Sequence, residues 1–560
     1  MLQRVLRMAV AVTVVVLAVI PDSMVGRLGG TAARALEAAE ECAPRDTEVK
    51  ARYPITGYWL IPRADACLTR RLVEAIHGVG ADTLITFGPR LMLAGVDAEG
   101  RVTGESAADF AGCVEDGLTC YQAAEATGRE IRSVYTYTAS EHFGPGLLRC
   151  PGLDRRVVNG GRVYYRLMLG DSCEASAYDL LLVTADGDGL GHMIAEAAAQ
   201  GMRVFPGLPV PPREEVKTWL PDLAHLPVLN AFTERVVADY RQRYGDSGVL
   251  GGLYQSFELA MRDRLDDDPI IALYEAQHEV VARAWPGQTI MVSPFWDARR
   301  GRGFPPERAE RGFDEIAATR AGAPMVIAIQ DGRGVGKVPV HGADEADAPV
   351  DPRLEPVTGP VTNRQAYYGS VRDYVDAAAR RVRPGVELWV NVEVFEPTPV
   401  QGECGRADPL PLRGRTTKAR VDRQVAAAGP HPTKIISYGW DPFLTCRDHP
   451  SAPSLADELA ANGQQPVVVH AAPAERNGVA GVTVEGHHLR GGTLRFTYHR
   501  AGTGPVTVEA PQEWHEPRGG RESAWAPFAP ENPDPARPWV TISAVNGAGH
   551  AATSGYAMGL

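Results

Sequence analysis

Short apolar runs recur along the chain, and segments with the helical pattern of apolar and polar positions lie between them. The runs cover residues 55–61, 82–89, 202–209, 248–258, 289–297, 324–332, 387–396 and 434–441. The helix-like segments cover residues 67–80, 190–201, 229–245, 269–287, 308–322 and 366–385. Near-continuous apolar strands that alternate with amphipathic helices are typical of a parallel sheet buried on both faces. The pattern predicts an α/β fold, a (β/α)8 TIM barrel, and the alternative is a doubly wound open sheet.

The interval between the second and third runs is far longer than a β/α unit needs. We predict an insertion over about residues 97–178, which holds four of the eight cysteines. This density indicates a small subdomain stapled by disulfides. Because loops that follow barrel strands lie on the active-site face, the insertion is expected to wall one side of the cleft. A second long loop, 333–365, follows the sixth run on the same face.

The pattern changes after the barrel segment, which we place at residues 54–455. From 462 to 560, short strands are separated by glycine, proline and asparagine turns, which predicts a β-sandwich. This region carries Trp514, Trp525 and Trp539. Tryptophans on such modules can stack on sugars, but a place in the core is the commoner role.

The start of the chain has the features of an export signal. Arg4 and Arg7 precede an apolar stretch over 8–20, and Ala33-Arg34-Ala35 is one possible cleavage site. We therefore predict a signal peptide over 1–35 and a linker over 36–53, with an uncleaved membrane anchor as the alternative. Either interpretation indicates a secreted or extracellular protein, and cleavage of the signal would leave no stable membrane span.

Composition and cysteine content narrow the class of protein. The chain has 560 residues, 44% of them hydrophobic, and a net charge of −12. This acidic balance, without a basic stripe, argues against a nucleic-acid partner. All eight cysteines follow the signal and none forms a CxxC motif, so disulfides are favoured over zinc. Proximity suggests the pairs 42–67, 113–120, 150–173 and 404–446, although the sequence leaves other pairings open.

Aromatic, amide and carboxylate side chains gather where the predicted strands end, which is the catalytic end of a barrel. Rings can stack on the apolar faces of sugars, while polar groups bind the hydroxyls, so this lining favours a carbohydrate. None of these strand ends contributes a histidine, so we expect no metal and no cofactor. The expected substrate-binding residues are Tyr58, Trp59, Phe87, Arg90, Tyr254, Gln255, Trp296, Asp297, Gln330, Asp331, Trp389, Asn391, Tyr438 and Trp440.

Two glutamates stand out among these strand ends. Glycoside hydrolysis needs one carboxyl group that protonates the leaving oxygen and a second that acts as nucleophile or base. Glu258 ends the fourth run and Glu393 lies in the seventh, so both side chains could face one pocket. Either glutamate alone would suggest a salt bridge or a helix cap, whereas the pair amid aromatic residues favours catalysis. A retaining enzyme would place the two carboxyl groups about 5 Å apart.

The segment LWVNVEVFEP, 388–397, shows how a carboxylate can occur in an apolar strand. Alternation places Trp389, Asn391, Glu393 and Phe395 on one face, with the valines on the other. We expect the valines to face the helices and the polar set to face the barrel lumen. Glu396 is then expected at the rim.

Several of these runs resemble a family with a TIM-barrel fold that is classed as a domain of unknown function and is associated with glycoside hydrolysis. The resemblance rests on Gln330-Asp331-Gly332 in the sixth run and on W-x-N-x-E-x-F over 389–395 in the seventh. It covers about 54–445 and leaves the insertion and the C-terminal region outside it. The arrangement of glutamates on the fourth and seventh strands is similar to that of retaining barrel glycosidases. This similarity implies that Glu258 is the acid/base and Glu393 the nucleophile. Many such enzymes have Asn before the first glutamate, whereas this chain has Phe257, so Asn391 or Gln255 would have to bind the sugar.

These observations predict a secreted glycoside hydrolase, active as a monomer on an extracellular or cell-envelope polysaccharide. The alternative is a non-catalytic carbohydrate-binding or extracellular matrix protein on a barrel scaffold, which would keep the aromatic residues without needing both glutamates. A serine hydrolase is disfavoured because Ser293 and Ser437 lack a GxSxG motif.

Overall fold

The computed structural model describes residues 42–264, 268–397, 413–447, 449–518 and 520–560. The predicted signal peptide, the first residues of the linker and Cys404 lie outside these ranges. The chain divides into two compact units, Met1–Pro44 and Arg45–Leu560, and the second contains all the elements described below. In the described part of the chain, no helix is both long and apolar enough to cross a membrane.

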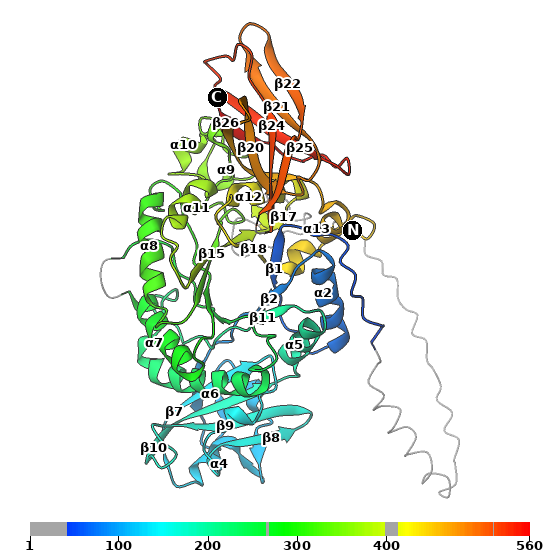
Figure 1. The fold of residues 1–560 in the computed structure, drawn as a ribbon. Coiled ribbons are helices and arrows are strands. Elements are labelled where there is room, and N and C mark those ends of the chain that lie inside the picture. Colours follow the sequence, from blue (N-terminus) through cyan, green and yellow to red (C-terminus); the bar gives the residue numbers. More distant parts are fainter. Residues whose placement is uncertain (1–41, 265–267, 398–412, 448, 519) are drawn as a thin grey trace, which may run out of the picture. The chain divides into compact units, whose positions relative to one another are not determined.

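Eight parallel strands form a barrel, one in each predicted apolar run (Figure 1). In chain order they are β1 (Ile55–Trp59), β2 (Thr83–Ile85), β11 (Arg203–Phe205), β12 (Leu253–Gln255), β13 (Ile290–Val292), β14 (Met325–Gln330), β15 (Val386–Glu393) and β18 (Lys434–Tyr438). Their order in the sheet is β11-β2-β1-β18-β15-β14-β13-β12. The first and last strands of this order meet through Val204 N–H to Val249 O at 2.8 Å and Tyr254 N–H to Pro206 O at 2.9 Å. The barrel prediction is confirmed, and the open sheet is wrong because its two edges bond to each other.

A ring of helices surrounds the strands (Figure 1). They are α2 (Ala66–Gly78), α5 (Gly189–Ala199), α6 (Leu226–Tyr244), α7 (Pro269–Ala284), α8 (Pro306–Ala318), α11 (Val371–Ala379), α12 (Lys418–Ala428) and α13 (Leu455–Asn462). Local sequence defines where they begin: the Asp65 carboxylate accepts the Leu68 N–H at 2.8 Å and caps α2. The apolar stripe of each helix covers the outer face of the strands.

Strand alternation divides the core into two layers. Leu388, Val390 and Val392 of β15 belong to the large cluster between strands and helices. Trp389 belongs instead to the small cluster inside the barrel, together with Phe205. The expected alternation of this strand is therefore confirmed through Val392. Glu396 differs from its expected rim position: it is 2% exposed and accepts a hydrogen bond from Arg333 at 3.1 Å.

A six-stranded sheet is inserted between β2 and α5, and it spans Met92 to Ala185. Its strands, in sheet order, are β4 (Val102–Thr103), β3 (Met92–Val96), β7 (Glu130–Ala139), β10 (Ala177–Ala185), β9 (Arg162–Leu169) and β8 (Arg155–Asn159). The predicted range 97–178 begins next to β3 and ends inside β10. The disulfides Cys113–Cys120 and Cys150–Cys173 are confirmed. Cys67 and Cys446 are also disulfide-bonded, and the pairings predicted for them stay predictions.

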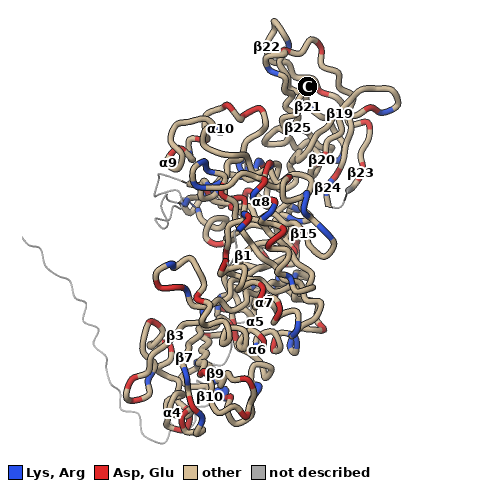
Figure 2. Tube along the Cα trace, turned by 90° about the vertical axis from the view of Figure 1, so that its left-hand side faces the viewer, with Lys and Arg blue, Asp and Glu red and all other residues tan. Residues whose placement is uncertain are grey.

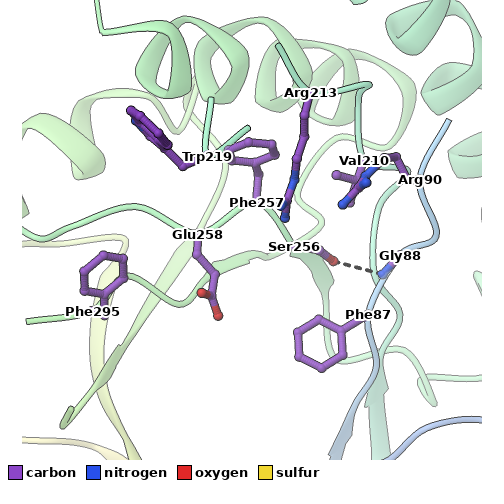
Figure 3. A pocket seen from close by; sticks show the side chains of 10 residues that line it. All are labelled: Phe87, Gly88, Arg90, Val210, Arg213, Trp219, Ser256, Phe257, Glu258 and Phe295. Carbon is purple, nitrogen blue, oxygen red and sulfur yellow. Dashed lines mark hydrogen bonds between the residues drawn. The ribbon is translucent and has the colours of Figure 1, made fainter. Parts of the chain in front are cut away.

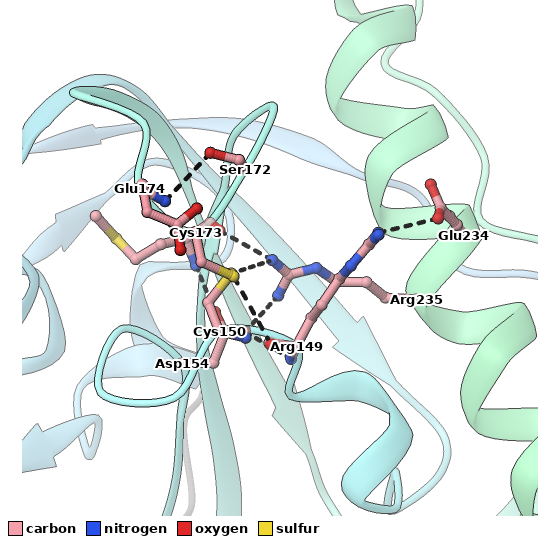
Figure 4. Close-up of a disulfide and its surroundings, with 9 residues drawn as sticks. Arg149, Cys150, Asp154, Ser172, Cys173, Glu174, Glu234 and Arg235 are labelled. Atoms are coloured by element: carbon pink, nitrogen blue, oxygen red, sulfur yellow. Dashed lines mark hydrogen bonds and ion pairs between the residues drawn. A yellow bond between two sulfur atoms is a disulfide. The ribbon is translucent and has the colours of Figure 1, made fainter.

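A buried ion pair fixes the insertion to the barrel (Figure 4). Asp154, beside the Cys150–Cys173 disulfide, accepts the Arg235 guanidinium of α6 at 2.8 Å. The remaining carboxylate oxygen accepts the Met168 N–H at 2.9 Å, and Arg235 also donates to the Met168 carbonyl at 3.0 Å. The side chains of Asp154 and Arg235 are 1% and 5% exposed. Such a pair tolerates the loss of neither partner, because the other would remain as an uncompensated buried charge.

The C-terminal region forms two four-stranded antiparallel sheets. One contains β19 (Val467–Arg476), β20 (Val479–His487), β24 (Arg521–Pro527) and β23 (Trp514–Arg518), and the other β22 (Gly504–Pro511), β21 (Gly492–Arg500), β25 (Trp539–Asn546) and β26 (Tyr556–Gly559). Their facing side chains share one core that includes Val484 and Phe496, as in a β-sandwich. Trp525 is 1% exposed. The Arg476 guanidinium lies over Trp514, 4.2 Å from the centroid of the Trp514 ring.

We expect Arg235→Met to lower the free energy of unfolding by about 3–5 kcal/mol, because Asp154 would stay buried without its partner. Arg149→Gln is the matched control, since Arg149 bonds Glu234 at 2.9 Å on the same helix but is 61% exposed. The control is expected to cost less than about 1 kcal/mol. Urea unfolding measures both free energies. Equal effects of the two variants would contradict the conclusion that the buried pair of Asp154 and Arg235 stabilises the fold.

Candidate active site

An aromatic cluster occupies the C-terminal end of the barrel. Trp59 of β1, Phe87 after β2, Tyr254 of β12 and Tyr438 of β18 have neighbouring ring centroids 5.6 to 6.4 Å apart. Phe395 extends the cluster, 5.9 Å from Tyr438. Four predicted substrate-binding residues therefore come together from strands that are far apart in the sequence.

Two glycines allow the segments after β2 and β11 to approach closely. A Cβ atom on Gly207 would lie 1.9 Å from the Gly88 nitrogen, so neither position has room for a larger residue. The Gly88 N–H donates to Ser256 Oγ at 2.9 Å. This contact connects the loop after β2 to the loop after β12, which carries Glu258.

Glu258 lies exposed in a pocket of about 450 Å³ beside the aromatic cluster (Figure 3). Gln330, the last residue of β14, donates its amide to the Glu258 carboxylate at 3.0 Å and to the Ser293 carbonyl at 2.9 Å. The two hydrogens of the Gln330 amide allow both bonds, and the second bond fixes the amide so that it orients the carboxylate. The predicted residues Glu258 and Gln330 thus form one unit.

Glu393 lies at the end of β15 and is 5% exposed. Its carboxylate accepts the Val335 N–H at 3.2 Å, and its backbone N–H donates to Asp331 at 3.1 Å. Burial, and after it the nearby Asp331 carboxylate, raise the pKa of Glu393 to about 7. The Lys337 and Arg413 cations act in the opposite direction. Glu393 is therefore a carboxyl group that changes its charge near neutral pH.

Asp331 lies next to Glu393 and is fully buried. It accepts the Arg333 N–H at 3.0 Å and the Gln424 amide of α12 at 2.8 Å, besides the Glu393 N–H. Gly332 has φ +67, and this left-handed turn brings the Arg333 N–H back to the carboxylate. Burial raises the pKa of Asp331 to about 6. The Gln330-Asp331-Gly332 motif therefore serves both glutamates, since Gln330 orients Glu258 and Asp331 supports Glu393.

Lys337 links the two glutamates electrostatically. Its ammonium lies 3.6 Å from the centroid of the Phe295 ring. Burial lowers the pKa of Lys337, whereas the carboxylates of Glu393, Asp297 and Glu258 act in the opposite direction. The Asp297 carboxylate itself pairs with Arg299 at 2.6 Å. The Lys337 ammonium therefore interacts electrostatically with both candidate catalytic carboxylates.

Other predicted site residues lie away from the pocket. Tyr58, Trp296 and Trp440 are fully buried in the layer between strands and helices. The Gln255 amide points outward, where its Nε2 donates to Gln277 at 2.5 Å and its carbonyl oxygen accepts the Phe257 N–H. A strand that ends at the site directs only every second side chain into it.

Trp389 and Asn391 face the lumen below the pocket. Trp389 pairs in register with Lys434, the first residue of β18, so it lies toward the opposite end of the barrel. Asn391 donates to Ser293 Oγ at 3.2 Å and is 1% exposed. Arg90, in contrast, is exposed and lines the pocket.

The sequence pattern missed three residues of this region: Lys337, Arg213 and Trp219. Lys337 follows the glycine-rich stretch after β14, and the other two lie in the loop between β11 and α6. These residues lie in loops that follow barrel strands, where barrel active sites are built, and this position was the signal by which the sequence could have identified them. Within the described residues, no group of three or more histidine, cysteine, aspartate or glutamate side chains could hold a metal ion.

Comparison with known families gives a match within the insertion. A family model named "Domain of unknown function (DUF8405)" matches residues 102–181, from β4 into β10. That stretch lies outside the segment on which the sequence resemblance rests. No curated protein matches the chain.

Solved structures show distant similarity to the chain. A "putative alpha-L-fucosidase" from Bacteroides thetaiotaomicron VPI-5482 has 15% identity and a TM-score of 0.40, covering 76% of this chain and 97% of that one. A modular endo-beta-1,4-mannanase from Cellulomonas fimi has 12% identity and a TM-score of 0.30, covering 67% and 81%. A family GH18 chitinase from Chromobacterium violaceum has 10% identity and a TM-score of 0.28, covering 76% and 85%. At these values the function has to be argued from the site itself.

The raised pKa of Glu393 predicts a pH-dependent stability. A carboxyl group whose pKa is about 7 in the folded chain and 4.5 in the unfolded chain stabilises the fold fully below pH 4.5. This contribution is lost as the pH rises through 7. We expect Glu393→Gln, which does not titrate, to be more stable than the wild type at pH 8 by up to about 3 kcal/mol, and the difference to vanish near pH 4.

Urea unfolding at both pH values measures this difference. Glu279→Gln, on the exposed side of α7, is the control and is expected to change neither value. A Glu393→Gln effect of the same size at pH 4 and pH 8 would contradict the assigned pKa.

Proposed function

We propose that this protein is a secreted retaining glycoside hydrolase that cleaves an extracellular or cell-envelope polysaccharide. The observation that carries the proposal is the pair of glutamates at one barrel end, one exposed in a pocket and one buried, which both act on Lys337. Two carboxyl groups in different environments are what acid and nucleophile roles require. The aromatic cluster beside them supplies surfaces for sugar rings.

In the first step Glu258 protonates the glycosidic oxygen while Glu393 attacks the anomeric carbon. The bond to the leaving sugar breaks and a covalent glycosyl-enzyme forms. Glu258, now a carboxylate, then takes a proton from water, and the water oxygen displaces Glu393. Gln330 holds the Glu258 carboxylate in one orientation through both half-reactions.

Glu393 has to be ionised to act as the nucleophile. Its raised pKa means that the ionised form prevails only above about pH 7, where Lys337, Arg413 and the Val335 N–H stabilise the charge. Once it is ionised, a carboxylate with a raised pKa is a more basic and therefore stronger nucleophile.

Export of the protein is supported by its disulfides. Cys113–Cys120 and Cys150–Cys173 form in the insertion, and such bonds persist in oxidising compartments. The proposed signal peptide over 1–35 would direct the chain there.

Substitution of the two glutamates separates an enzyme from a sugar-binding protein. Turnover of a panel of bacterial and plant polysaccharides is expected to fall by orders of magnitude in Glu393→Gln and by about 10²–10⁴ in Glu258→Gln. Sugar binding should persist in both variants, because the aromatic cluster is intact. Glu279→Gln is the control, and unchanged turnover in Glu393→Gln would reject the proposed function.

Rescue of alanine variants by azide distinguishes the acid/base from the nucleophile. Azide should restore turnover of Glu258→Ala on an aryl glycoside and give a product of retained configuration, because the nucleophile is still present. Azide with Glu393→Ala should give the inverted product. The opposite result would exchange the roles of the two glutamates.

Removal of the Asp331 charge should move the pH profile. The Asp331 carboxylate raises the pKa of Glu393, so Asp331→Asn is expected to lower it. The acidic limb of kcat/KM would then shift to lower pH, because Glu393 stays ionised in more acidic solution. Hydrolysis rates between pH 4 and pH 9 measure the shift, and a limb that stays in place would show that another group controls it.

A further inference from the structure

The pocket around Glu258 contains a cluster of cations as well as aromatic rings. Arg90 follows β2 and Arg213 follows β11, and both side chains are exposed in the pocket. The Arg213 guanidinium lies 6.0 Å from the centroid of the Phe257 ring. Figure 3 shows both arginine side chains ending on the Ser256 side of the pocket, with the Glu258 carboxylate between them and Phe295.

Arg90 and Arg213 repel each other. Burial lowers the pKa of the Arg90 guanidinium, and the Arg213 charge lowers it further, while Glu105 acts weakly in the opposite direction. Within the described ranges, neither arginine forms an ion pair with a carboxylate. The two like charges disfavour each other, and an anion bound between them would offset the repulsion.

Two other arginines at this end of the barrel, Arg299 and Arg333, have carboxylate partners. Arg299 pairs with Asp297 at 2.6 Å, and Arg333 pairs with Glu396 at 3.1 Å. Acidic and basic residues are interspersed along the chain (Figure 2), and the net charge is −12. In a protein with excess acid, a pair of adjacent arginines without a counter-ion marks a place for an external anion.

We propose that the sugar bound in this pocket carries an oxyanion, either a carboxylate or a sulfate, which Arg90 and Arg213 bind. The planar guanidinium fork suits both groups, and Phe87, Trp219 and Phe257 provide the apolar faces against which the ring lies. The inference rests on the proposed function, since it names the substrate class of the same site: an acidic polysaccharide.

Sugars that differ only in the charged group test the inference. The probes are glucuronate and glucose 6-sulfate, each against glucose, and galacturonate against galactose, bound to the Glu393→Gln protein at low and high salt. We expect at least one anionic sugar to bind about tenfold or more tightly than its neutral partner, and less tightly as salt increases. The carboxylate and sulfate probes show which oxyanion is preferred.

Arginine variants complete the test. Arg90→Gln and Arg213→Gln, made in the Glu393→Gln protein, should each remove most of the preference for the anionic sugar. Arg71→Gln, on the exposed face of α2, should leave it unchanged. Equal binding within every pair, or a preference that survives both arginine substitutions, would overturn the inference.

The two proposals fail in different ways. A protein that hydrolyses a neutral polysaccharide through Glu393, and binds both sugars of each pair equally, keeps the proposed function and loses the acidic substrate. A protein whose turnover is unchanged by Glu393→Gln loses the proposed function, whatever sugar it binds.

Discussion

The contact between Asp331 and Glu393 is the constraint around which this end of the barrel is arranged. Two carboxyl groups lie side by side in a nearly dry position, where each disfavours the charge of the other. The Glu393 N–H, the Arg333 N–H and the Gln424 amide stabilise the Asp331 charge. Removal of this support would leave a buried carboxylate without partners, so β14, β15 and α12 must keep their relative positions.

The same contact explains why the two candidate catalytic groups differ. Glu393 is confined by the strand and by Asp331, whereas Glu258 lies on a loop and is oriented by the single amide of Gln330. Lys337, placed by the turn at Gly332, lies within electrostatic range of both. In the proposed reaction the exposed Glu258 transfers the proton and the buried Glu393 forms the bond to the sugar.

The insertion shows a different balance of forces. Its disulfides restrict its own loops, but its attachment to the barrel depends on the buried pair of Asp154 and Arg235. Burying two charges is costly, and hydrogen bonds to the Cys150 and Met168 backbone groups compensate for part of that cost. The family match over 102–181 lies within this inserted segment.

The periodicity of the chain determined the barrel, its eight strands and the side of β15 on which Glu393 lies, because burial on both faces requires near-continuous apolar runs. It also placed Glu258 and Gln330 at the ends of the fourth and sixth predicted runs. The tertiary structure alone decided which strand-end residues face the pocket: Tyr58, Gln255, Trp296 and Trp440 turn outward, since the exact residue at which a strand ends is not encoded in the pattern. It also brought Lys337, Arg213 and Trp219 to the site, because loop paths depend on contacts between residues distant in sequence.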